Sequence, residues 1–170
     1  MRILIHLLLG LAAFPLAAQP VGLSHLLSLT TCTDTTCMAA FADSAGFCQM
    51  PGVGNEEDGW IWFSCAHIGD GDFTDPVHMQ SIGYFGYAHS YYREYITGTR
   101  DTTFAAALTE ELGQLGFTME KPIAKGHSFR SAAYPGLHIN RLEKRATNVG
   151  RDGIARKELM WVFKVVVPQR

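Results

Sequence analysis

Apolar residues spaced three or four positions apart predict a helix in the second half of the chain, at Phe104, Leu108, Leu112 and Leu115. Asp101 precedes this helix and can cap it, because its carboxylate accepts hydrogen bonds from the free amides of the first turn. Gly116 can end the helix in a left-handed conformation, with Phe117 folding back onto it. Residues 34–47 repeat these signals, so we expect a second, shorter helix over about 36–45.

Three strand-like segments follow each predicted helix. They span about 47–52, 59–68 and 81–97 after the first helix, and about 117–122, 128–141 and 157–167 after the second. Turn-rich polar residues separate the first two segments in each half, at 54–59 and at 124–126. This order predicts an α+β fold made of an α-β-β-β unit twice, with a six-stranded, mainly antiparallel sheet and two helices on one face.

The two halves also resemble each other residue by residue. Residues 34–41 read DTTCMAAF and residues 101–108 read DTTFAAAL, so five of eight positions are identical. A chance match is the alternative, but the same order of elements follows each segment, which favours an internal duplication. We therefore expect two repeats, about 34–97 and 101–167, within a single domain that covers residues 19–170.

The first 18 residues have the order of a secretory signal peptide. Arg2 supplies a positive charge, residues 3–11 are mostly apolar, and small residues precede a cleavage point after Ala18. The apolar run is shorter than the about 20 residues that a membrane span needs, and Cys32 lies too far beyond it for lipidation. The sequence therefore predicts a signal peptide over 1–18, no transmembrane anchor, and a secreted or periplasmic protein.

Four cysteines lie in the first part of the exported chain, at Cys32, Cys37, Cys48 and Cys65. An even number in an oxidising compartment predicts two disulfides, whereas zinc sites usually contain a C-x2-C pair that is absent here. A helix between Cys37 and Cys48 holds them about 15 Å apart, which is beyond disulfide reach. We expect the pairs Cys32–Cys37 and Cys48–Cys65. A count outward from the centre of the 54–59 loop places Cys48 directly opposite Cys65 in the first hairpin. The alternative for the first pair is two free thiols.

Charge is divided unevenly along the chain. Residues 19–92 hold eight acidic residues and no Lys or Arg, whereas residues 93–170 hold thirteen basic and eight acidic residues. The cations of the last connection are Arg141, Lys144, Arg145, Arg151, Arg156 and Lys157. Attraction between the halves, self-association between molecules, and an anionic protein, glycan or lipid partner are three interpretations. Nucleic acid is not expected to bind an exported chain with a pI near 6.4.

An aromatic row gives the most distinctive candidate binding surface. If residues 82–96 form one strand, alternation places four side chains on one face: Tyr87, His89, Tyr91 and Arg93. Small residues occupy the other face, where a helix can approach closely. The row is then exposed, and its rigid amphipathic side chains suit recognition of a protein or a sugar. The simpler interpretation is that Tyr and Phe favour strands.

The sequence contains few residues in patterns typical of metal binding or catalysis. Asp70, Asp72 and Asp75 resemble part of a calcium loop, but the complete ligand spacing and the terminal Glu are absent, so a solvated turn is the simpler interpretation. Neither H-E-x-x-H nor G-x-S-x-G occurs. The sequence favours a non-catalytic binding domain that uses the aromatic face or the charged hairpins, without a cofactor. A small extracytoplasmic hydrolase, metal-assisted if the acidic loop binds an ion, is the alternative.

Overall fold

The computed structural model describes residues 21–55, 60–64, 80–86, 92–149 and 155–169. The helices of this part are α1 (Leu23–Ser28), the short 3₁₀ helix η1 (Leu29–Thr31), α2 (Thr35–Ser44) and α3 (Thr102–Gln114). The strands are β1 (Cys48–Asn55), β2 (Trp60–Ser64), β3 (Gln80–Phe85), β4 (Tyr92–Thr99), β5 (Thr118–Ile123), β6 (Gly126–Arg130), β7 (His138–Val149) and β8 (Ala155–Pro168). None of these helices is both long and apolar enough to cross a membrane.

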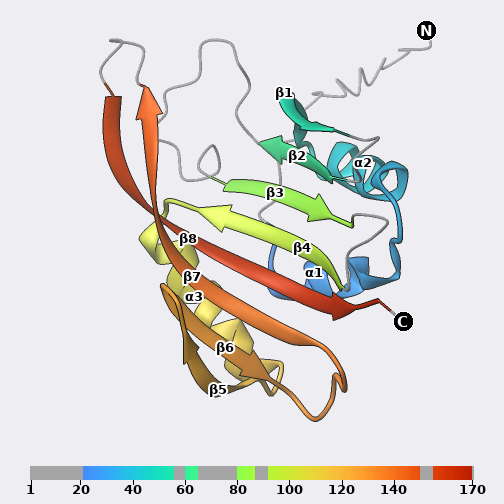
Figure 1. Ribbon diagram of the computed structural model, residues 1–170, viewed down its shortest axis with the longest axis vertical. Coiled ribbons are helices and arrows are strands. Elements are labelled where there is room, and N and C mark those ends of the chain that lie inside the picture. The colour runs from blue at the N-terminus through green and yellow to red at the C-terminus, as the bar shows by residue number, and fades with distance from the viewer. Residues whose placement is uncertain (1–20, 56–59, 65–79, 87–91, 150–154, 170) are drawn as a thin grey trace, which may run out of the picture.

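All eight strands belong to one twisted sheet, in the order β1-β2-β3-β4-β8-β7-β6-β5 (Figure 1). Every neighbouring pair is antiparallel. The predicted α+β class with an antiparallel sheet is therefore confirmed. The six predicted segments all contribute to the sheet, but 81–97 and 128–141 each contain two strands, which gives eight strands in place of six.

Both predicted helix starts are confirmed by side-chain caps. The Asp34 carboxylate accepts a hydrogen bond from the backbone amide of Cys37 at 2.8 Å, and the Asp101 carboxylate accepts one from the amide of Thr103 at 2.8 Å. Each bond satisfies an amide that has no partner within its own helix. The repeated Asp-Thr-Thr sequence therefore performs the same local task at α2 and at α3.

The two helices also end in the same way. Gly46 and Gly116 have φ values of 79° and 74°, in the left-handed region that favours glycine. The amides of Phe47 and Phe117 then donate to carbonyls five residues earlier, at 2.8 and 2.9 Å, and both phenyl rings are buried. This is the helix end that the Gly-Phe pairs predict.

Alternation along the central strands separates two faces of the sheet. Tyr95, Val165 and Ile139 lie opposite one another on β4, β8 and β7 and are buried in the hydrophobic core. The same core contains Met38 of α2 and Leu108 of α3. We call this side of the sheet the core face. The residues between these positions point to the other side, which we call the opposite face.

Helix α3 also holds the first turn of α1 in place. Gly22 precedes α1 and has no side chain that could cap it, and the Glu111 carboxylate instead accepts hydrogen bonds from the amides of Leu23 and Ser24, both at 2.8 Å. Burial, the largest single influence, raises the pKa of Glu111. The hydrogen bonds from Ser24 and Leu23 together outweigh it, so the pKa lies below its ordinary value.

Replacing Glu111 with glutamine is expected to lower the free energy of unfolding by about 1–2 kcal/mol at pH 7, because the amide loses the charge and can accept at only one atom. A depressed pKa in the folded state stabilises the protein above the unfolded-state pKa, and this stabilisation is lost as the pH falls through the folded-state value. Urea unfolding between pH 3 and pH 7 should show that only Glu111→Gln removes this acid-dependent loss. Glu110→Gln is the control, because Glu110 is an exposed neighbour whose partner among the described residues is Gln114. Equal curves for both variants would contradict the assignment.

Candidate functional site

The predicted single strand over residues 82–96 does not form. β3 ends at Phe85, β4 begins at Tyr92, and the two strands pair antiparallel with Phe85 opposite Glu94, so the chain must reverse between them. An alternating pattern suits two short strands as well as one long strand, and only a glycine at 86 marks the break. Three predicted binding residues in this connection, Tyr87, His89 and Tyr91, lie outside the described residues.

Arg93, the fourth predicted binding residue, is described and lies beside the first disulfide. Its Nη1 donates to the backbone carbonyl of Cys32 at 3.4 Å, and the hydroxyl of Tyr95 donates to the same carbonyl. The Tyr84 hydroxyl donates to the carbonyl of Thr33 at 2.9 Å. Burial raises the pKa of Tyr95 to about 12, so its hydroxyl keeps its proton at neutral pH. These contacts fix the segment that leads into α2.

The predicted Cys32–Cys37 disulfide is present, with 5.5 Å between the two Cα atoms. The second predicted disulfide involves Cys65, which lies outside the described residues. In the β1–β2 hairpin, Cys48 is paired with Ser64, so the expected register with Cys65 directly opposite is wrong by one residue. The β1–β2 ladder contains a register shift between Gln49 and Gly54, which a count from the centre of the loop could not include.

The acidic residues proposed as a partial calcium loop, Asp70, Asp72 and Asp75, also lie outside the described residues. Within the described part of the chain, no three His, Cys, Asp or Glu side chains are grouped closely enough to hold a metal ion. The calcium prediction therefore stays untested.

The basic residues of the last connection lie on a long β-hairpin. β7 and β8 pair without interruption from His138 opposite Val166 to Val149 opposite Ala155. β6 stops alongside Leu142 and β4 stops alongside Trp161. Residues 144–149 and 155–160 therefore extend beyond the neighbouring strands of the described sheet. We call these two segments the arm, which rises at the upper left of Figure 1.

The arm combines positive charge with exposed apolar surface. The two segments of the arm contain four Lys or Arg and one Glu, a net charge of +3. Lys144, Arg145 and Lys157 are exposed. Leu159, opposite Arg145 in the hairpin, has 43% of its surface exposed. Such a surface attracts anions at long range and can bury an apolar group on contact.

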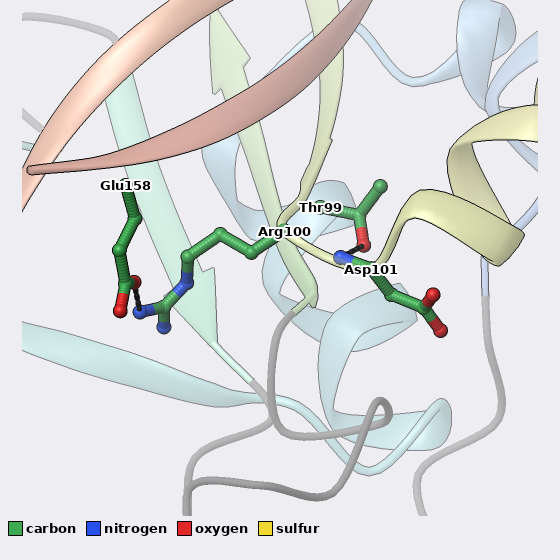
Figure 2. Close-up of polar contacts among 4 residues, drawn as sticks. All are labelled: Thr99, Arg100, Asp101 and Glu158. Atoms are coloured by element: carbon green, nitrogen blue, oxygen red, sulfur yellow. Dashed lines mark hydrogen bonds and ion pairs between the residues drawn. The ribbon is translucent and has the colours of Figure 1, made fainter.

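An ion pair ties the base of the arm to the start of α3. Nη1 of Arg100, which directly follows β4, lies 2.7 Å from Oε2 of Glu158 on β8 (Figure 2). The neighbouring Thr99 is fully buried and its hydroxyl oxygen accepts a hydrogen bond from the Asp101 amide at 3.1 Å. The end of β4, the cap of α3 and the arm are thereby held in one arrangement.

A cleft of about 320 Å³ lies between α3 and the base of the arm. It is lined by Thr102, Ala105, Ala106, Thr109, Arg141 and Trp161, and we call it the α3 cleft. The helix supplies a wall of small residues, and the strands supply an indole and a guanidinium. Each lining residue lies in a predicted helix or strand, but only the packing of α3 against β7 and β8 brings them together.

A second polar cluster lies on the opposite face of the sheet. Nζ of Lys164 is 2.5 Å from Oε2 of Glu94, and both side chains are more than four-fifths buried. Lys144 is exposed at its surface, but partial loss of its hydration, and next the Lys164 charge, lower its pKa. Burial, and next the Arg130 charge, lower the pKa of His138, so its imidazole is neutral at pH 7. The cluster joins β4 to β8 by neutralising one charge with another.

The comparisons with known proteins add no family. No protein-family model, no curated protein and no solved structure matches the chain. The arm and the α3 cleft are therefore the features of the described structure from which a function can be argued.

Proposed function

We propose that this protein is an extracytoplasmic, non-catalytic binding domain whose arm contacts an anionic protein partner. The observation that carries the proposal is the arm itself: its exposed cations lie on a hairpin that extends beyond its neighbouring strands. Charges placed in this way speed association with a partner of opposite sign and orient it on contact. Because no described strand pairs with the arm beyond the ends of β4 and β6, its strand edges also suit contact with a partner.

The lining of the α3 cleft favours binding over hydrolysis. A hydrolase needs a nucleophile or a general base beside the bond that is cleaved, usually a histidine, a carboxylate or a cysteine. The described residues that line the α3 cleft include none of these side chains. Their threonines, arginine and tryptophan can hold a ligand through hydrogen bonds, charge and apolar contact. The alternative hydrolase would have to use residues elsewhere.

We also propose that the domain arose by duplication of an α-β-β-β-β unit, with α2 and α3 on the same face of the sheet, and that a signal peptide over 1–18 directs its export. The matching helix caps support the duplication. So does the strand order, because each half supplies four consecutive strands and the halves meet at β4 and β8. The Cys32–Cys37 disulfide is compatible with an oxidising compartment.

Removing two cations from the arm is expected to weaken binding of the exported domain to polyglutamate about tenfold or more, and to reduce the salt dependence of binding. The variant is Arg145→Gln with Lys157→Gln, and biolayer interferometry measures affinity at several salt concentrations. The control, Lys121→Gln with Arg130→Gln, removes the same charge from exposed positions on β5 and β6. Similar losses in both variants would show that net charge, and not the arm, determines binding.

A further inference from the structure

Within the described part of the chain, the Arg141 guanidinium in the α3 cleft has only a long contact to a carboxylate. Its side chain has 29% of its surface exposed, and its Nη2 lies 3.6 Å from Oε1 of Glu143. That separation is too long for a hydrogen bond, and an exposed pair of this kind contributes little to stability. A guanidinium presents two parallel donors that match the two oxygens of a carboxylate. A ligand carboxylate in the cleft could therefore form the short paired bonds that Glu143 does not.

The other walls of the cleft suit an apolar side chain. Trp161 offers an aromatic surface beside Arg141, and Ala105 and Ala106 of α3 lie among the residues that line the same space. An apolar side chain held between an indole and methyl groups loses water from both of its sides. A sugar could stack a C–H face on Trp161, but the hydroxyls around its ring would lose hydrogen bonds to water against the alanines. The walls thus favour a peptide over a glycan.

The length of the cleft indicates how much peptide it can hold. Thr102 and Thr109, seven residues apart on α3, both line it, and seven helical residues rise about 10 Å at 1.5 Å per residue. An extended chain advances about 3.3 Å per residue, so about three residues fit.

The same face of the β7–β8 hairpin continues from the cleft onto the arm. Arg145 follows Arg141 at an interval that keeps both side chains on one face, and Leu159 and Trp161 alternate in the same way on β8. The surface beyond the cleft therefore again pairs a cation with an apolar group. A chain leaving the cleft toward the arm would meet the same chemistry a second time.

We infer that the α3 cleft binds an extended segment of about three residues from the partner protein, in which an acidic residue adjoins an apolar one. The carboxylate pairs with Arg141, and the apolar side chain lies between Trp161 and the alanines of α3. This inference rests on the proposed binding function and adds to it the site and the chemistry of the recognised segment.

The test uses the exported domain and a fluorescein-labelled, acetylated peptide amide of alternating Glu and Leu, with fluorescence anisotropy as the readout. Ala106→Trp fills the cleft and is expected to weaken peptide binding at least about tenfold. Ala107→Trp, at the next exposed position, which does not line the cleft, should leave binding within about twofold. Circular dichroism of both variants establishes that α3 remains folded.

Variants of Arg141 test the carboxylate contact. Arg141→Gln is expected to weaken peptide binding about tenfold, and Arg141→Lys less, because lysine keeps the charge but lacks the paired donors. The matching peptide of alternating Gln and Leu should bind wild type about as weakly as the acidic peptide binds Arg141→Gln. Equal peptide affinities for Ala106→Trp and Ala107→Trp, or an Arg141→Gln variant that binds normally, would overturn the inference.

Two results separate this inference from the proposed function. If polyglutamate binding depends on the arm but the short peptide binds the cleft variants as tightly as wild type, the proposed binding function stands. The inference about the cleft then fails. If an acidic polyuronate binds and is blocked by Ala106→Trp whereas the peptide is not, the cleft recognises a glycan and the peptide assignment is wrong. If neither polyglutamate nor the peptide binds, the proposed binding function itself is wrong.

Discussion

Replacing Gly126 with alanine is expected to lower the free energy of unfolding by about 3 kcal/mol or more, enough to unfold a marginally stable domain. A Cβ atom at this position would lie 1.9 Å from the carbonyl oxygen of Arg141, far inside van der Waals contact. The obstructing atom belongs to the backbone of β7, so no side-chain rotation relieves the clash. β6 would have to separate from β7 at the point where Gly126 faces Leu142.

Gly113→Ala is the matched control for this prediction. Gly113 lies within α3, and a Cβ atom added there meets nothing within 4 Å. Alanine is preferred over glycine in a helix, so the free energy of unfolding should rise by about 0.5–1 kcal/mol. Urea unfolding at pH 7 measures both variants. A Gly126→Ala protein as stable as wild type would mean that β6 and β7 do not approach as closely as described.

Replacing Lys164 with methionine is the second substitution with a large expected effect, a loss of about 3 kcal/mol in the free energy of unfolding. Lys164 and Glu94 form an ion pair between β8 and β4 whose side chains keep only 19% and 18% of their surface exposed. Removal of one partner leaves the Glu94 carboxylate largely buried without its counter-charge. The cost reflects that unpaired charge more than the attraction that was lost.

The double substitution Lys164→Met with Glu94→Leu tests this reasoning. It removes both charges, so most of the lost stability should return. Arg130→Met is the control, because the Arg130–Glu120 pair keeps 56% and 36% of its side-chain surfaces exposed and should cost about 1 kcal/mol or less. Thermal unfolding of the four proteins completes the comparison. If the double variant is no more stable than Lys164→Met alone, the buried charge does not explain the loss.

The local features of the fold were accessible from the sequence because each depends on residues close in the chain. A capping carboxylate and the amides that it binds lie within three residues of each other, and the same holds at Asp34 and Asp101. The Cys32–Cys37 disulfide joins residues five positions apart. In such cases the sequence pattern predicts the contact directly, because the interacting residues are neighbours in the chain.

The strand breaks were less accessible, since the apolar pattern alone carries no sign of a chain reversal. In the segment 128–141, predicted as one strand, the chain turns between Arg130 and His138. Gly136, with a φ of 81°, lies in that turn, but a glycine within a strand pattern can equally mark a bulge. Only pairing with the neighbouring strands distinguishes these cases, and pairing depends on residues far away in the sequence.

Some features of the candidate site could be predicted from the sequence, and others depend on contacts between distant residues. The sequence alone determined that the cations gather in the last connection and that this connection joins two strands, because composition and alternation are local properties. Tertiary structure decided that β4 and β6 stop before the hairpin does, which leaves the arm extended. It also decided that Arg141 and Trp161 face the small residues of α3 across a cleft. These relations join residues from three elements, and their positions are set by which side chains the whole core can bury together.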